Sequence, residues 1–247
     1  MIVMKKNSMS FQDLKKDIRK NASKERARAS ARFFKTGKGE YGEGDRFLGL
    51  TMGEVRKLSK QYRNLDFSHV VKLLESSWHE ERMIGLLILV LRYEEAKSVP
   101  EKRTVFDFYI AHREAVNSWD LVDATTPNIV GDFLSQQKNR DILYRFARSK
   151  NLWERRMAIL ATYRFVRSGD FHDTVSLATL LLRDTHDLIH KATGWMLREI
   201  GKRDELTLIR FLEQYATEMP RTMLRYALEK FSPERRQYFL KKKSFSC

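Results

Sequence analysis

His79-Glu-Glu-Arg-Met-Ile-Gly-Leu86 and Trp153-Glu-Arg-Arg-Met-Ala-Ile-Leu160 are the two stretches that decide the fold, because they resemble each other. They match at Glu, Arg, Met and Leu, and 153 − 79 = 74 residues separate them, or two steps of 37. An intermediate step falls at Asn117 and a further one at Ile189. Steps of this length are typical of stacked helix–turn–helix pairs in HEAT-type repeats. The sequence therefore predicts an all-α, HEAT-like helical-repeat solenoid.

The composition and the periodicity agree with this fold class. Only 4 of the 247 residues are Pro and 11 are Gly, too few for the many turns of a sandwich or barrel. Helical spacing predicts one amphipathic helix over residues 11–35 and helices over most of residues 47–240. We expect a single domain over residues 1–247, disordered ends at 1–10 and 241–247, and a glycine-rich loop at 36–46.

The cysteine content and the apolar runs limit the class of protein. Cys247 is the only cysteine and the last residue, which excludes an intrachain disulfide and a multi-cysteine zinc site. The longest apolar run, residues 84–91, is far shorter than the roughly 20 residues of a membrane span. We expect a cytoplasmic monomer with no membrane partner.

The charge points to an anionic partner. The chain has 47 Lys and Arg against 32 Asp and Glu, a formal net charge of +15. A helical-repeat solenoid presents one helix of each pair along a concave wall, so we expect a basic cleft there that suits nucleic acid. The charge alone leaves open two alternatives: cations scattered over solvated faces, and a scaffold that binds acidic protein segments.

Trp119 and Asp123 are the first candidate site residues. They follow a cap at Asn117 or Ser118 and stand four residues apart, so a helix places the indole and the carboxylate on one face. The alternative is a packed Trp119 and an Asp123 that only pairs with a neighbouring arginine.

Two later helices carry further candidates. Arg155 and Arg156 are adjacent at a helix start and point about 100° apart, so one can face the cleft while the other bridges neighbouring helices. Lys191, Trp195 and Arg198 form a single stripe at helical spacing, with Gly194 leaving room beside the indole. A packed face whose cations extend to solvent is the alternative for this stripe.

Together these strings resemble the DNA alkylation repair family, the HEAT-like-repeat alkylpurine DNA glycosylases. The resemblance covers roughly residues 11–240, and Trp-Asp-Leu-Val-Asp is its most specific part. The strings that carry it are Phe34-Lys-Thr-Gly-Lys-Gly-Glu-Tyr-Gly-Glu-Gly-Asp-Arg-Phe-Leu-Gly49, Ser118-Trp-Asp-Leu-Val-Asp123, Trp153-Glu-Arg-Arg156, Asp187-Leu-Ile-His-Lys-Ala-Thr-Gly-Trp-Met-Leu-Arg-Glu199 and Arg221-Thr-Met-Leu-Arg-Tyr-Ala-Leu-Glu-Lys-Phe231.

The resemblance implies an N-glycosidase that removes N3- and N7-alkylated purines from duplex DNA without a deep base pocket. It implies that Asp123, Trp119 and Trp195 are catalytic and that Arg156 lines the cleft and holds the DNA. Lys191 and Arg198 match positions that contact phosphates. The glycine-rich loop is a departure that marks one branch of the family.

No metal or cofactor is expected. The six histidines form no paired ligand motif, since His186 and His190 lack the Glu of a His-Glu-x-x-His helix, and we interpret all six as surface or packing residues. None of the candidate site residues is a Schiff-base lysine, so excision without strand cleavage follows. The main alternative is a non-catalytic nucleic-acid-binding scaffold, which gives no reason for Trp119, Asp123 and Trp195 together.

Overall fold

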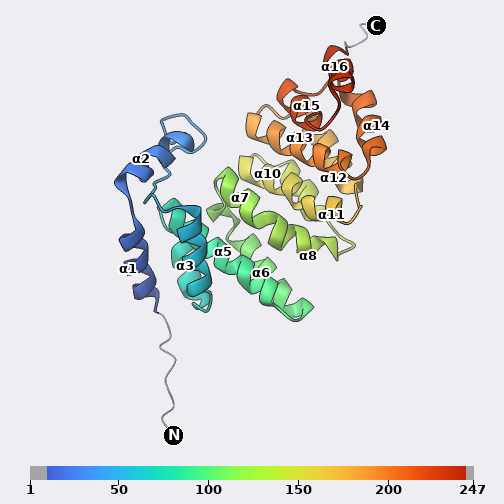
Figure 1. Cartoon of the computed structure of the whole chain (residues 1–247). Helices are drawn as coiled ribbons and strands as arrows, with labels where there is room; N and C mark the ends of the chain where they lie inside the picture. The colour runs from blue at the N-terminus through green and yellow to red at the C-terminus, as the bar shows by residue number, and fades with distance from the viewer. Residues whose placement is uncertain (1–9, 243–247) are drawn as a thin grey trace. The chain divides into compact units, whose positions relative to one another are not determined.

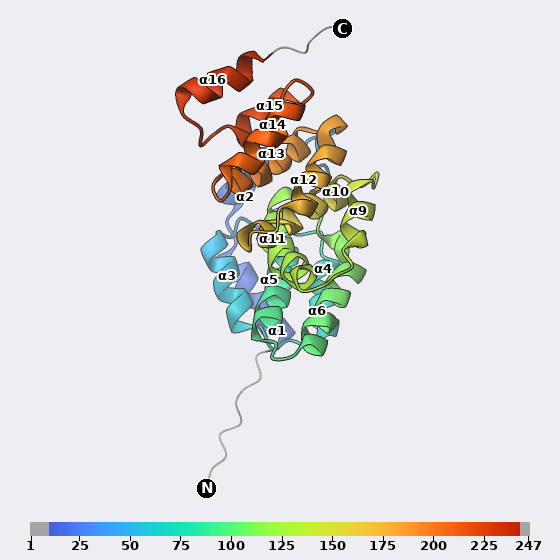
Figure 2. The ribbon, with the colours of Figure 1, turned by 90° about the vertical axis from the view of Figure 1, so that its right-hand side faces the viewer.

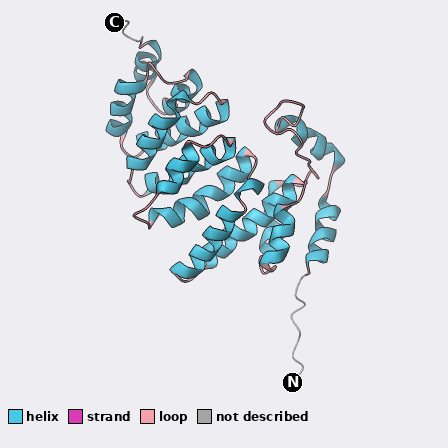
Figure 3. Ribbon diagram, turned by 180° about the vertical axis from the view of Figure 1, so that it is seen from behind, coloured by secondary structure: helices cyan, strands magenta, loops and turns pink. Residues whose placement is uncertain are grey.

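A computed structural model describes residues 10–242, and the regular elements of this part are all helical (Figures 1 and 3). The all-α prediction is confirmed, and the β pairing among these residues is limited to one bridge between Arg46 and Trp78. In chain order, the helices are α1 (Phe11–Asn21), α2 (Lys24–Phe33), α3 (Met52–Gln61), α4 (Phe67–Leu74), α5 (His79–Glu95), α6 (Val99–Ala111), η1 (Arg113–Ala115), α7 (Trp119–Thr126), η2 (Pro127–Gly131), α8 (Asp132–Ser135), α9 (Asp141–Ala147), α10 (Leu152–Ala161), α11 (Tyr163–Arg167), α12 (His172–Leu180), η3 (Leu181–Arg183), α13 (Asp187–Gly201), α14 (Glu205–Tyr215), α15 (Arg221–Ala227) and α16 (Pro233–Lys241).

The chain divides into two compact units, the first ending at Leu121 and the second beginning at Val122, inside α7. Whether they form the predicted single domain stays a prediction. Residues 1–9 and 243–247 of the predicted disordered ends lie outside the described residues. At their inner edges the prediction was wrong, because Ser10 caps α1 and Lys241 is the last residue of α16.

The N-terminal amphipathic stretch forms two helices instead of the predicted one. The chain is extended at Ala22 and Ser23, and the backbone N–H of Ser23 donates to the carbonyl of Leu48 at 2.9 Å. The Ser23 hydroxyl then accepts from the N–H of Arg26 and begins α2. A contact distant in sequence therefore breaks a helix that local periodicity favours.

The first unit is built around α5, which packs against α3, α4 and α6. Most of α5 is buried, including the charged first turn from His79 to Arg82. Residues 36–46 form the predicted glycine-rich loop between α2 and α3, with turns and positive backbone φ angles at Gly39 and Gly44. Buried polar groups at the start of α5 thus lie next to the N-terminal segments.

In the second unit, α10, α13 and α15 pack as successive layers (Figure 2). Gly194 lies where α13 meets α15: a Cβ there would come within 2.4 Å of the Met223 carbonyl oxygen and 2.6 Å of the Tyr226 Cβ. The expectation that Gly194 leaves room beside Trp195 was therefore wrong, since this glycine permits close helix packing.

The starts of the predicted repeat lie within two residues of helix starts. His79 is the first residue of α5, Asn117 lies two residues before α7, Trp153 is the second residue of α10, and Ile189 is the third of α13. The repeat itself stays a prediction. Among residues 10–242, every helix is too short or too polar to cross a lipid bilayer.

Candidate functional site

α7 carries both Trp119 and Asp123, one helical turn apart. One turn after Asp123 the helix continues into a π-helical segment, η2, that begins at Pro127. Proline has no N–H, so the carbonyl of Asp123 loses its usual partner four residues on. Arg164 of α11 binds this segment, donating from Nε to the Pro127 carbonyl and from Nη2 to the Asn128 side chain. A side chain of α11 therefore stabilises the π-helical segment.

The carboxylate of Asp123 forms a two-pronged ion pair with Arg156 of α10. Nε of Arg156 donates to Oδ1 at 2.8 Å and Nη2 donates to Oδ2 at 2.7 Å. The side chain of Arg156 is 5% exposed and that of Asp123 is 20% exposed. Nη1 of Arg156 donates to the Leu188 carbonyl of α13. The guanidinium is thus buried and fixed, while the Asp123 side chain stays partly exposed.

Arg155 points elsewhere, as the predicted angle between the two arginines requires. Its Nε donates to Asp184 Oδ2 at 2.6 Å, and its Nη1 donates to the carbonyls of Ser149 and Lys150. Arg155 is therefore the residue of this pair that ties α10 to the segment before α13.

The stripe on α13 is a row of cations, each paired with an acidic side chain. Lys191 Nζ lies 2.7 Å from Asp187 Oδ2, and Arg198 contacts Glu229. Trp195 lies between them along the helix, donates from Nε1 to Glu199 Oε1 at 3.2 Å, and lies 6.1 Å from the Tyr163 ring. That the Trp195 indole lies close to the Asp123 carboxylate stays a prediction.

Glu199 is a site neighbour that the sequence analysis missed. Its buried carboxylate accepts from the Trp195 indole and from Lys202 Nζ at 2.6 Å. The spacing of four residues between Trp195 and Glu199 was the available signal.

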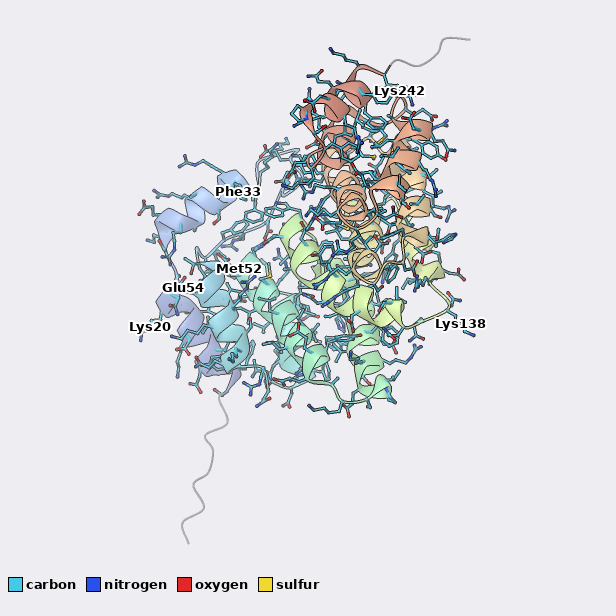
Figure 4. All side chains as sticks on the ribbon, turned by 45° about the vertical axis from the view of Figure 1, so that its right-hand side comes forward. Lys20, Phe33, Met52, Glu54, Lys138 and Lys242 are labelled. Atoms are coloured by element: carbon cyan, nitrogen blue, oxygen red, sulfur yellow. The ribbon has the colours of Figure 1, made fainter. Side chains whose placement is uncertain are left out.

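The indole of Trp119 packs against the end of α2 in the first unit. It stacks on Phe34 at 5.2 Å between ring centroids with 12° between planes, and it meets Phe33 edge-on at 5.9 Å. Phe33 is 66% exposed. Figure 4 labels its side chain at the end of α2. Trp119 therefore has aromatic neighbours that the sequence left unassigned.

His79 is a packing residue, since its ring contacts Phe34 and Phe47, but its polar contacts were not predicted. Its ring is buried, and each ring nitrogen contacts a carboxylate: Nδ1 is 2.8 Å from Asp45 Oδ2, and Nε2 is 2.9 Å from Asp120 Oδ2. Arg82 donates to the other oxygen of Asp45 at 2.7 Å. The glycine-rich loop is thereby joined to α5, and α5 to the start of α7.

The electrostatics of this cluster favour a charged imidazole. Burial by itself lowers the pKa of His79, but the hydrogen bonds and negative charges of Asp120 and Asp45 outweigh it and raise the pKa to about 9. Burial acts to raise the pKa of Asp45, yet contact with His79 and Arg82 keeps it below its ordinary value. Among residues 10–242, no group of three or more His, Cys, Asp or Glu side chains is placed to hold a metal ion.

Comparison with known proteins identifies the class. The family described as DNA alkylation repair enzyme matches residues 14–231, nearly the whole chain. The chain therefore belongs to the DNA alkylation repair enzyme family. Among solved structures it is similar to a predicted DNA alkylation repair enzyme from Enterococcus faecalis, with a TM-score of 0.67 and 16% identity over 86% of this chain and 98% of the other. At this identity the likeness shows a shared fold. No curated protein matches the chain.

Proposed function

We propose that this protein is a DNA glycosylase that excises N3- and N7-alkylated purines from duplex DNA. It hydrolyses the N-glycosidic bond and leaves the strand intact. The observation that carries the proposal is the Asp123 carboxylate, held at both oxygens by a buried arginine while the Asp123 side chain stays 20% exposed. Membership of the family supports the same reaction class.

The chemistry needs a fixed negative charge. An N3- or N7-alkylated purine is cationic and leaves readily, so the main barrier is the positive charge that develops on the sugar. A preorganised carboxylate stabilises an oxocarbenium-like transition state without reorganisation. In our proposal Asp123 provides this charge and orients the attacking water.

Arg156 acts here mainly through Asp123. Its guanidinium donates to both oxygens of Asp123 and to the Leu188 carbonyl, and its side chain is almost fully buried. We therefore propose that Arg156 positions the carboxylate, in addition to lining the cleft as the family resemblance implies.

We further propose that Trp119 and Trp195 are catalytic, each through an aromatic face that attracts the positive charge of the substrate. A cation held against such a face gains about 0.5–2 kcal/mol, depending on desolvation. Both indoles are half-buried, and each is oriented by a neighbour, Phe34 for Trp119 and Glu199 for Trp195.

DNA binding is proposed to use the predicted basic wall of a HEAT-like solenoid. Lys191 and Arg198 contact phosphates in this proposal, and each must then exchange an acidic partner, Asp187 or Glu229, for a phosphate. Such exchange makes binding depend on salt, because neutralised phosphates release counterions.

The test compares release of 7-methylguanine and 3-methyladenine from methylated duplex DNA by the wild type and by Asp123→Asn, at one salt concentration. We expect release by the wild type and a loss of at least about a hundredfold in the variant, with similar DNA affinity. Asp184→Asn is the matched control, because it removes the carboxylate paired with the adjacent arginine. Binding by the wild type without base release would instead favour the non-catalytic nucleic-acid-binding scaffold.

A further inference from the structure

Trp119 packs on a cluster of three mutually contacting rings within the first unit, since Phe34 also lies 5.0 Å from His79. Its indole stacks on Phe34, Phe34 lies 4.9 Å from Phe47 at 28°, and Phe47 lies 4.6 Å from His79 at 24°. The four rings come from α7, the end of α2, the segment after the glycine-rich loop, and α5. The face of Trp119 that meets Phe34 therefore depends on segments far away in sequence.

Two of these rings close the glycine-rich loop. Phe34 precedes the loop and Phe47 follows it, and their contact brings the two loop ends together. The loop end is also held on α5, because the N–H of His79 donates to the Arg46 carbonyl at 2.8 Å. Compact loops with joined ends often carry function.

His79 connects this loop to the residue beside Trp119. Its ring lies between Asp45 of the loop and Asp120 of α7. The other charged groups around it are engaged as well: Arg82 pairs with Asp45, and the Glu80 carboxylate accepts the N–H groups of Leu48, Gly49 and Leu50. An imidazolium bonded to two carboxylates is thus the link between the loop and the first turn of α7.

We propose that Phe34 and His79 are positioning residues that fix the indole of Trp119, Phe34 through ring contact and His79 by tying Asp45 to Asp120. The proposal rests on the proposed function in so far as Trp119 takes part in base excision. An aromatic ring attracts a cation over its face within about 6 Å, so the orientation of the indole decides whether it can act on the sugar.

The first test observes Trp119 without any activity. The chain has four tryptophans, so 5-fluorotryptophan labelling gives a fluorine NMR spectrum with few signals, and Trp119→Phe identifies the one from Trp119. We expect Phe34→Leu and His79→Gln to shift this signal and Phe34→Tyr to restore most of its wild-type position. Phe108→Leu is the control, because Phe108 is another half-buried ring of the first unit, in contact with Phe67 and His112. An unmoved Trp119 signal in both folded variants would overturn the proposal.

The second test measures single-turnover excision in a double-mutant cycle. We expect Phe34→Leu to slow excision roughly tenfold with DNA affinity within about twofold, and to have almost no further effect when Trp119 is already Phe. If the loss in the double variant equals the product of the losses in the two single variants, Phe34 does not act through Trp119. If the wild type releases no base, the proposed function fails, and the fluorine spectra still decide whether Phe34 and His79 orient the indole.

Discussion

At the scale of single residues, Asp123 and Arg156 form one unit, because both carboxylate oxygens accept from the same guanidinium. Breaking a buried ion pair leaves an uncompensated charge, which costs about 3–5 kcal/mol. A planar, two-pronged donor is needed to hold both oxygens, and a lysine offers only a point charge.

Arg156→Lys is therefore expected to lower the free energy of unfolding by about 1–3 kcal/mol and to reduce base release strongly. Chemical denaturation and single-turnover excision measure the two effects. Arg155→Lys is the control, because it loses a comparable contact with Asp184 on the same helix. Equal excision losses in the two variants would argue against a special link between Arg156 and Asp123.

His79 makes stability depend on pH. The pKa of His79 is raised to about 9 in the folded protein, above the ordinary 6.5. Its contribution to the free energy of unfolding is therefore complete below about pH 6.5 and is lost as the pH rises through 9. We expect the free energy of unfolding to fall over this window by about 3 kcal/mol more in the wild type than in His79→Gln. Parallel pH profiles of the two proteins would show that the imidazole is not charged as described.

Sequence analysis could assign residues whose partners lie within a few positions in the chain. It could not assign residues whose partners lie far away in sequence. Trp119 and Asp123 are visible because helical spacing brings them to one face. The Asp123–Arg156 pair agrees with the alternative in which Asp123 pairs with a neighbouring arginine, and that pairing is compatible with catalysis. His79 was missed because its partners, Asp45 and Asp120, lie 34 and 41 residues away, where no local pattern reaches.

At the scale of elements, contacts between segments distant in sequence set helix boundaries that local periodicity does not predict. The break at Ala22 and Ser23 contains neither Gly nor Pro, so periodicity alone predicts a continuous helix there. The hydrogen bond from Ser23 to Leu48 forms only in the folded unit. By contrast, the boundary at Ser168-Gly-Asp was predictable from sequence, because Gly169 adopts a positive φ of 82° just after the end of α11.

The packing of α13 on α15 gives a test at this scale. Gly194→Ala is expected to destabilise the protein by about 1–3 kcal/mol, since the added methyl group would collide with backbone of α15. Gly53→Ala is the matched control: the nearest atom to its new Cβ is 3.9 Å away, so we expect a neutral effect or a gain of up to about 1 kcal/mol. Thermal unfolding of both variants measures the difference, and a harmless Gly194→Ala would refute the close approach.

At the scale of the whole molecule, a net charge of +15 predicts strong but salt-sensitive binding to polyanions. The sequence establishes this total, whereas the positions of the charges relative to acidic partners appear only in the structure. Lys191 is one example, because Asp187 holds it one helical turn away.

Lys191→Ala is expected to reduce the slope of log affinity against log salt by about one unit or less. Asp187→Asn is expected to act in the opposite direction and strengthen binding, because it removes the carboxylate that lies 2.7 Å from Lys191 Nζ and competes with a phosphate. Titrations of duplex DNA at several salt concentrations measure both. An unchanged slope in Lys191→Ala would mean that this lysine contacts no phosphate.

The contact between Phe34 and Phe47 also affects how this region can change during evolution. Because the rings already hold the loop ends together, inserted residues between Gly37 and Gly44 extend only the tip, and doubling the length of a flexible loop costs only about 0.6 kcal/mol. A change in the length of the tip therefore leaves the ring contact at the base of the loop in place.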